Sequence, residues 1–246
     1  MTELAYMVRE DWAQHGTAMV PQSAVIRDWI GPAPYLFAVT DVKKFNSEGR
    51  SADLETAKFI APDASTRKVF NISELGGLRR EDRVIDHAVV ILHPYGERDL
   101  DALGDAVKDD VFKKVLVIIW SPRDMVHAWL DGLGAINLHI GEAFPAPDPV
   151  MVEAGKSMVD EEYNGLGSGH GKDAVVQLVR AFTDAGYPLD VDAWLRAYFR
   201  AGGTFRHGES IAKLLGEMKN GTKHRVQIRY RDNIVEILRG RVASKI

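Results

Sequence analysis

The strongest constraint on the fold lies between His87 and His139, where short apolar runs alternate with helical patterns. The apolar runs cover 87–92, 114–120 and 135–139, and the segments 99–107 and 123–130 between them place apolar residues on one helical face. Strands that alternate with helices predict a βαβαβ arrangement, with a parallel sheet and right-handed crossovers. Strands that are apolar throughout fit this arrangement, because helices cover both faces of a parallel sheet.

The first 72 residues add further elements to this pattern. Residues 35–40 follow a Gly-Pro-Ala-Pro turn and indicate a buried strand, and 58–61 and 67–72 are two shorter candidate strands. Residues 3–12 carry apolar side chains at near-helical spacing after Thr2, which predicts an N-terminal helix. The polar segment 43–54 is predicted to be a loop.

Three prolines at 145, 147 and 149 predict a domain boundary, because proline interrupts both helices and strands. Asp148 and Pro149 are also typical of a helix start. Helical patterns then follow one another at 150–163, 173–184, 191–200, 205–220 and 233–242. The predicted fold is therefore α/β: a small parallel, Rossmann-like βαβαβ domain at 1–144, followed by an all-helical domain at 149–246 with a basic C-terminal face.

The composition excludes several function classes. The 246 residues contain no cysteine, which rules out disulfides, thiolate metal sites and cysteine nucleophiles. No apolar run approaches the ~20 residues that cross a bilayer, so no membrane association is expected. The first residues lack a signal-peptide pattern, which favours a cytoplasmic protein. The sequence indicates no metal site and no particular cofactor.

The first candidate site lies where the predicted parallel strands end. Ligands of open α/β sheets bind at this edge. The polar residues that follow the strands are Asp41, His93, Tyr95, Ser121, Arg123 and Asp124. Arg123 and a helix N-terminus would attract phosphate, and His93 would serve as an acid or base, so a nucleotide or sugar phosphate is the expected ligand. The alternative is that these are ordinary loop residues, with Ser121 or Asp124 capping a helix.

The second candidate is the glycine-rich segment 165–172, directly before a helical pattern. Glycines allow backbone N–H groups to converge on an anion, so Gly169, Gly171 and Lys172 are predicted to bind one. The Walker pattern is incomplete, because Leu166 replaces its first glycine and Asp173 its hydroxyl residue. A flexible connection between two helices is the alternative.

The third candidate is the basic end of the chain. Residues 196–246 contain twelve Lys and Arg against four Asp and Glu, a net charge of +8, whereas residues 1–195 carry −12. Such a segment favours a polyanionic partner. The predicted nucleic-acid-binding residues are Lys213, Lys219, Lys223, Arg225, Arg229 and Arg231. The alternatives are a solvated face or docking onto the acidic part of the chain.

Three functions follow from these candidates. The first is binding of a phosphate-rich partner, above all nucleic acid, through the basic region, where the patterns at 191–200 and 205–220 outline a helix-turn-helix. The second is an enzyme or sensor that binds a nucleotide or sugar phosphate at the strand ends. The third is a homo-oligomeric scaffold that associates through the aromatic helix at 191–199.

Overall fold

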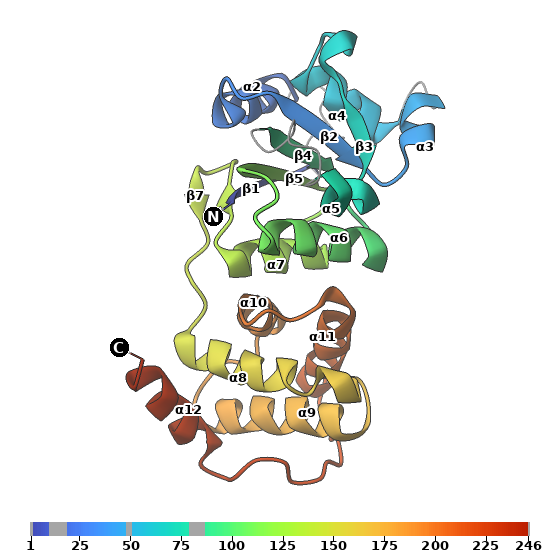
Figure 1. The fold of residues 1–246 in the computed structure, drawn as a ribbon. Coiled ribbons are helices and arrows are strands. Elements are labelled where there is room, and N and C mark those ends of the chain that lie inside the picture. The colour runs from blue at the N-terminus through green and yellow to red at the C-terminus, as the bar shows by residue number, and fades with distance from the viewer. Residues whose placement is uncertain (1, 10–18, 48–50, 79–86, 246) are drawn as a thin grey trace. The chain divides into compact units, whose positions relative to one another are not determined.

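A computed structural model describes residues 2–9, 19–47, 51–78 and 87–245 (Figure 1). The chain divides into two compact units, with the break between Phe144 and Pro145. The short segment Asp131–Leu133 groups with the second unit.

The first unit is built on a seven-stranded sheet. Its strands are β1 (Glu3–Val8), β2 (Tyr35–Val39), β3 (Val69–Asn71), β4 (Ala88–Leu92), β5 (Lys114–Ile119), β6 (Ile136–Asn137) and β7 (Glu142–Ala143). They lie in the order β3-β2-β4-β5-β1-β6-β7, and all neighbours are parallel except β6 and β7. The predicted α/β class with a parallel sheet is confirmed.

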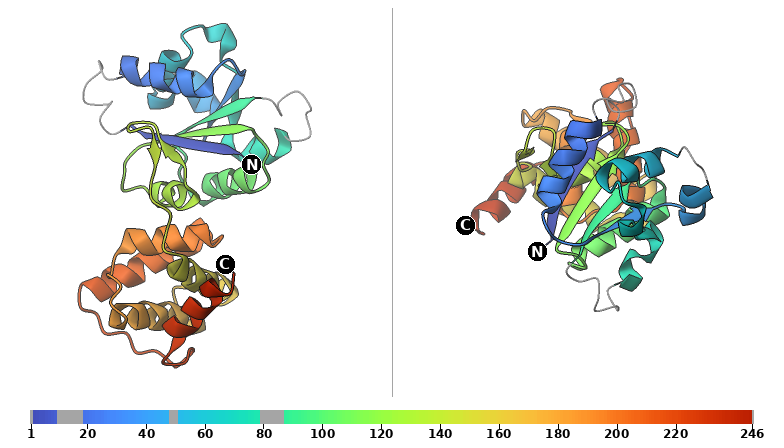
Figure 2. Two further views of the ribbon diagram at one scale, coloured as in Figure 1. Left: turned by 90° about the vertical axis from the view of Figure 1, so that its left-hand side faces the viewer. Right: turned by 90° about the horizontal axis from the view of Figure 1, so that it is seen from above.

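Helices cover both faces of this sheet. They are α2 (Met19–Ile30), α3 (Val42–Ser47), α4 (Ala52–Ile60), α5 (Leu75–Leu78), α6 (Glu97–Lys108) and α7 (Met125–Leu133), with 3₁₀ turns η1 (Ala64–Thr66) and η2 (Ile72–Glu74). Helices α2 and α4 lie on one face and α6 and α7 on the other (Figure 1), and the left view of Figure 2 shows the same layers. Ile26 of α2 and Ile60 of α4 pack in one core with Val90 and Ile118 of the sheet.

The prediction of an N-terminal helix was wrong, because residues 3–8 form β1. This strand pairs with β5 over its whole length and with β6 on its other side. Leu4, Met7 and Val8 have a spacing that fits a helix, but Leu4–Val8 is apolar at every position, and Ala5, Tyr6 and Met7 are almost fully buried. Sheet pairing therefore decides the conformation. Residues 10–12 of the predicted helix lie outside the described residues.

The predicted loop at 43–54 was also wrong over its described part, because it contains most of α3 and the start of α4. The Ser51 side chain caps α4 by accepting a hydrogen bond from the Leu54 N–H at 3.1 Å. The predicted strand at 58–61 is instead the end of α4, whereas the one at 67–72 is confirmed in part by β3. Residues 48–50 lie outside the described part.

The second unit is helical: α8 (Pro149–Val159), η3 (Glu162–Asn164), α9 (Gly169–Asp184), α10 (Val191–Arg200), α11 (Phe205–Lys219) and α12 (Ile234–Ala243). All five predicted α-helices are confirmed, and α9 begins four residues earlier than predicted. The aromatic rings of α10 lie in the core, since Trp194 packs on Phe182 and Phe199 on Phe205, each at 5.1 Å between ring centroids. These rings are therefore buried within the unit, and oligomerisation through this helix stays a prediction.

Candidate ligand site at the carboxyl ends of the strands

Three adjacent strands of the first unit end on large polar or aromatic residues. Arg9 follows β1, His93 follows β4 and Trp120 follows β5, which lies between the other two strands. The backbone N–H groups of Arg9 and His93 donate to carbonyl oxygens of β5, those of Ile119 and Ile118, each at 2.8 Å. These bonds continue the sheet ladder and place the three residues side by side at its carboxyl edge.

Arg9 is the most unusual residue of this edge, because its side chain is only 2% exposed. Its Nη2 donates to Glu55 Oε2 at 2.8 Å, and its Cζ lies 5.2 Å from the Trp120 ring centroid. Its Nε and Nη1 are buried without a hydrogen-bond partner among the described residues. Burial lowers the pKa of Arg9, although the negative charges of Glu55 and Asp53 act to raise it. Arg9 is thus a buried cation with one hydrogen-bonded nitrogen out of three.

His93 lies against the same indole ring and also has a buried nitrogen without a hydrogen-bond partner. Its backbone φ of 47° is in the left-handed region, which residues other than glycine rarely adopt. Its Nδ1 is hydrogen-bonded to the Asp53 carboxylate, and its ring centroid lies 5.2 Å from that of Trp120. The carboxylate can only accept, so Nδ1 carries the proton. The buried Nε2 has no partner in the described part of the chain.

The first turn of α4 supplies both carboxylates of this cluster. The Ser51 cap fixes the start of the helix, and Asp53 and Glu55 then lie within its first turn, where acidic residues are favourable. Asp53 holds His93 and Glu55 holds Arg9. We call Arg9, Asp53, Glu55, His93 and Trp120 the strand-end cluster.

Of the six strand-end residues proposed from the sequence, His93 belongs to this cluster. The Asp41 carboxylate instead accepts from the N–H groups of Lys43 and Lys44, at 2.8 and 3.1 Å, and starts α3. The Asp124 carboxylate accepts from the Ser121 N–H at 2.9 Å and closes the turn before α7. Both are capping roles, which is the alternative reading of these residues.

The remaining two strand-end candidates, Tyr95 and Arg123, have exposed side chains. A ligand-binding role for them, and for Asp41, Ser121 and Asp124, stays a prediction.

The sequence reasoning missed Arg9, Asp53, Glu55 and Trp120. Arg9 could have been found from the sequence, because it is the first charged residue after the apolar run that ends at Val8. His93 was found in the same way, since it follows the apolar run that ends at Leu92. A signal for the two carboxylates was Ser51 followed by acidic residues at a helix start. The sequence did not indicate that Arg9 is buried or that it contacts Trp120, because both depend on which strands are neighbours in the sheet.

The glycine-rich segment of the second unit has a packing explanation. A side chain at Gly171 would place its Cβ 2.3 Å from the Gly165 carbonyl oxygen, and the intervening Leu166 is fully buried. Gly169 has a φ of 54°, which favours glycine. The segment therefore folds back tightly on the start of α9, and anion binding by Gly169, Gly171 and Lys172 stays a prediction.

The basic end of the second unit contains an extended segment at 221–231 between α11 and α12 (Figure 1). Gln177 of α9 pins it, accepting from the N–H groups of Arg229 and Tyr230 and donating to the Tyr230 carbonyl. Arg180 Nη2 also donates to the His224 carbonyl at 2.7 Å. Arg229 forms an ion pair with Glu161 at 2.6 Å. The other predicted cations, Lys213, Lys219, Lys223, Arg225 and Arg231, are exposed.

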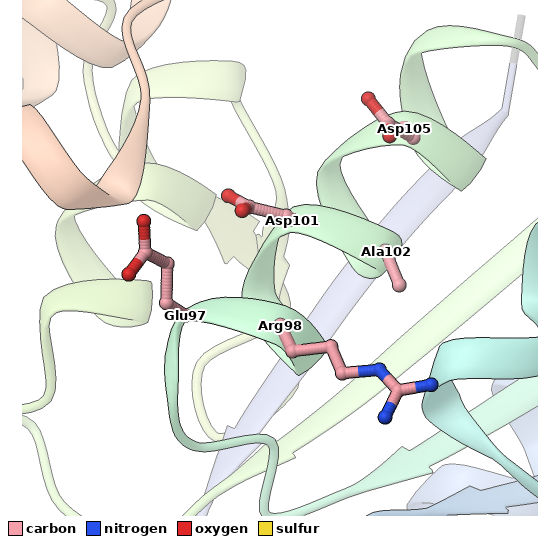
Figure 3. A pocket seen from close by; sticks show the side chains of 5 residues that line it. All are labelled: Glu97, Arg98, Asp101, Ala102 and Asp105. Atoms are coloured by element: carbon pink, nitrogen blue, oxygen red, sulfur yellow. The ribbon is translucent and has the colours of Figure 1, made fainter.

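An open pocket of about 530 Å³ lies along α6 of the first unit. Glu97, Asp101 and Asp105 line one side of the helix, while the Arg98 side chain leaves on another side (Figure 3). Burial, together with the charges of Glu97 and Asp105, raises the pKa of Asp101. Because a single helix lines this pocket, it holds a ligand less firmly than a site built from several elements.

Within the described residues, no group of three or more His, Asp or Glu side chains is arranged to hold a metal ion. The helices of the same residues include none with the length and apolarity that a membrane span requires. The chemistry of the strand-end cluster is therefore the main guide to function. Comparison with known proteins adds no further guide, because no protein-family model, no curated protein and no solved structure matches this chain.

Proposed function

We propose that the first unit binds a small phosphorylated ligand, a nucleotide or a sugar phosphate, at the strand-end cluster. The observation that carries this proposal is the buried Arg9 guanidinium, whose Nε and Nη1 have no acceptor among the described residues. The location supports it as well, because open α/β sheets bind their ligands at the carboxyl ends of the strands.

An anion is the ligand that these groups favour. A guanidinium has five N–H donors, and Nε and Nη1 account for three of them. Each buried donor left unsatisfied costs about 1–3 kcal/mol, and more when it is charged. A phosphate group offers several charged oxygens in one place, and its bonds to arginine are among the strongest hydrogen bonds in proteins. The unpaired His93 Nε2, on the same indole ring, is a hydrogen-bond acceptor, so it suits a hydroxyl group of the ligand rather than its phosphate oxygens.

Titration calorimetry and thermal shifts test this proposal. The probes are inorganic phosphate, glucose 6-phosphate and AMP, with sulfate and unphosphorylated glucose and adenosine as comparisons. We expect at least one phosphorylated probe to bind and to raise the melting temperature by mass action. Equal responses to phosphorylated and unphosphorylated compounds, or no response to any probe, would contradict the proposal.

The variant Arg9→Lys tests how much the planar guanidinium group contributes to binding, apart from its charge. It keeps the positive charge but loses the planar donors that match a phosphate, so we expect affinity to fall about 10-fold or more. Lys108→Gln is the matched control, because Lys108 is exposed and lies at the opposite end of α6 from the strand-end loop. The control should bind like the wild type.

A second function, binding of nucleic acid, is favoured by the segment at 221–231. Hydrogen bonds from Gln177 and Arg180 fix the backbone of this segment. The exposed side chains of Lys223, Arg225 and Arg231 therefore extend from a fixed backbone. No ion pair joins these three cations to any described residue. Arg229 contributes less, because Glu161 already neutralises it.

Fluorescence anisotropy with single- and double-stranded oligonucleotides at rising salt tests this second function. Replacing Lys223, Arg225 and Arg231 by Gln should weaken binding and reduce the salt slope by roughly 2–3, since each phosphate contact contributes about 0.7–0.9. The triple variant Lys43→Gln, Lys58→Gln, Lys108→Gln changes the net charge equally within the first unit. An equal effect of both triple variants would contradict a site on the basic segment.

A further inference from the structure

We propose that the strand-end cluster is catalytic and hydrolyses the phosphate monoester of the ligand that it binds, with His93 as the proton-accepting group. This inference rests on the binding function proposed above and adds a reaction to it. Four features of the cluster support it: the orientation of His93, its open nitrogen, the adjacent Arg9 and the access of solvent.

The first feature is the orientation of the His93 ring. The left-handed backbone at φ 47° turns the residue out of the β4 strand, and strained conformations of this kind gather at functional sites. The Asp53 carboxylate fixes Nδ1, and Trp120 packs against the ring at an interplanar angle of 69°. Two neighbours from two different elements thus hold one imidazole in one orientation.

The second feature is the state of Nε2. Because Nδ1 donates to Asp53, a neutral His93 carries its lone pair on Nε2. This nitrogen is buried and meets no donor among the described residues. A histidine whose Nδ1–H is bound by an aspartate while Nε2 is open is the arrangement that general bases use, because the aspartate also stabilises the imidazolium that forms.

The third feature is Arg9, whose guanidinium lies on the same indole ring as His93. Glu55 holds Nη2, which leaves Nε and Nη1 for phosphoryl oxygens. Fixed donors that face the charge of a phosphoryl group are the main source of catalysis in phosphoryl transfer. Arg9 therefore binds the group that reacts, and Glu55 is its positioning residue.

The fourth feature is solvent access. Trp120 is 46% exposed, although Arg9 and His93, which it contacts, are largely buried. Solvent therefore reaches the indole ring that both groups contact, whereas His93 Nε2 itself is buried, so the reacting water must enter the cluster with the ligand. Hydrolysis needs only this one co-reactant.

The reaction follows from these positions. His93 Nε2 takes a proton from a water molecule, and the water oxygen forms a bond to phosphorus. The bond between phosphorus and the sugar oxygen breaks in line with the attack, and that oxygen leaves with the electron pair and takes a proton from solvent, while Nε2 releases its proton to solvent. The products are inorganic phosphate and the free alcohol, and His93 and Arg9 return to their initial states.

Parallel assays of turnover and binding test the inference on the full chain. Turnover is measured as release of p-nitrophenolate from p-nitrophenyl phosphate and of inorganic phosphate from AMP and glucose 6-phosphate. Binding of inorganic phosphate is measured by calorimetry. The test variants are His93→Asn and Asp53→Asn, and His207→Asn on α11 of the second unit is the matched control. Asparagine suits position 93, because it tolerates a left-handed backbone.

We expect the wild type and the control to hydrolyse at least one probe. His93→Asn should lower kcat by about 100-fold or more, as loss of a general base does, with less than about a 3-fold change in phosphate affinity. Asp53→Asn should lower kcat with little change in KM, because it removes the orientation of His93 and leaves Arg9 in place. Melting curves establish that each variant is folded.

The outcomes separate this inference from the binding proposal. Phosphate binding without turnover of any probe overturns catalysis and leaves binding intact. Turnover that survives His93→Asn also overturns the role of His93. Failure of every probe and of inorganic phosphate to bind overturns both proposals.

Discussion

In the second unit, the buried carboxylate of Glu153 accepts hydrogen bonds from Lys156 and Lys245, each at 2.6 Å. In the first unit, the buried guanidinium of Arg9 is hydrogen-bonded through one nitrogen of three. Both groups are charged and hidden from solvent, but one is satisfied by its own unit and the other is not. Because buried polar groups are nearly always paired, the unpaired Arg9 donors support the proposed ligand site.

The same contrast holds for the neutral groups of the two units. In the second unit, the Tyr198 hydroxyl donates to the Glu162 carboxylate and accepts from the Thr204 N–H at 3.0 Å. The buried His224 Nε2 is an exception in the second unit, since it has no hydrogen-bond partner among the described residues and only lies 3.4 Å from a Glu217 carboxylate oxygen. In the first unit, His93 Nε2 has no such neighbour among the described residues. The hydrogen-bond networks around Tyr198 and Glu153 in the second unit are closed, whereas the strand-end cluster of the first unit leaves polar atoms unpaired.

The largest expected effect on stability comes from Gly203→Ala, which disrupts the hydrogen-bond network around Tyr198. The new Cβ would lie 2.1 Å from a carbon of the buried Tyr198 ring, so the ring must move away from Glu162. We expect a loss of about 3 kcal/mol in the free energy of unfolding, measured by urea titration.

Gly216→Ala on α11 is the matched control, because open space surrounds its position. It should leave stability unchanged or raise it by about 0.5–1 kcal/mol, as replacement of a helical glycine does. Equal effects of the two alanines would show that the Tyr198 ring is not held as described.

Tyr198→Phe removes the hydroxyl at the centre of the same network and should cost about 1–3 kcal/mol at neutral pH. Burial and the Glu162 carboxylate raise the pKa of Tyr198 above its ordinary value of 10.0. The stability that this hydroxyl contributes is therefore complete below pH 10 and declines as the pH rises further. Urea titrations at pH 7 and above pH 10 should show the difference between wild type and variant shrinking with pH.

Glu153→Gln removes the negative charge that Lys156 and Lys245 contact, and so tests the second network of this unit. Hydrogen bonds from Lys156 and Lys245 lower the pKa of Glu153 below its ordinary value of 4.5. Its contribution is thus present above pH 4.5 and is lost as the pH falls through the lower folded-state value. Because both lysines are about half exposed, we expect a loss of about 1 kcal/mol at pH 7. The loss should shrink as the pH falls below 4.5.

The smallest effect is expected at the α6 pocket of the first unit. The pKa of Asp101 is raised by burial and by Glu97 and Asp105, so its ionised form opposes folding at neutral pH. Asp101→Asn should therefore stabilise the protein at pH 7 by a few tenths of a kcal/mol, since the side chain is exposed. The gain should disappear below pH 4, where the protonated aspartic acid no longer opposes folding. A destabilised variant at pH 7 would contradict this account.

The parts of the fold that depend on local pattern could be predicted from the sequence. Residues 88–92 before His93 and 115–119 before Trp120 are apolar at every position, and the apolar residues of α9 and α10 repeat at helical spacing. The strand β1 could not be separated from a helix by spacing alone, because its central place depends on pairing with β5 and β6. The contact between Arg9 and Trp120 was missed for the same reason, since it depends on strand order.

Arg9→Met tests the central claim most directly, because methionine fills a similar volume without N–H donors. Glu55 is 55% exposed and stays solvated without its partner. We predict that the ligand-free variant melts at the same temperature as the wild type or higher, because a buried group with unpaired donors has been removed. We also predict that inorganic phosphate and AMP bind about 100-fold more weakly, measured by calorimetry. Undiminished phosphate binding, or a ligand-free variant several kcal/mol less stable, would contradict the account, because Arg9 would then be a structural residue.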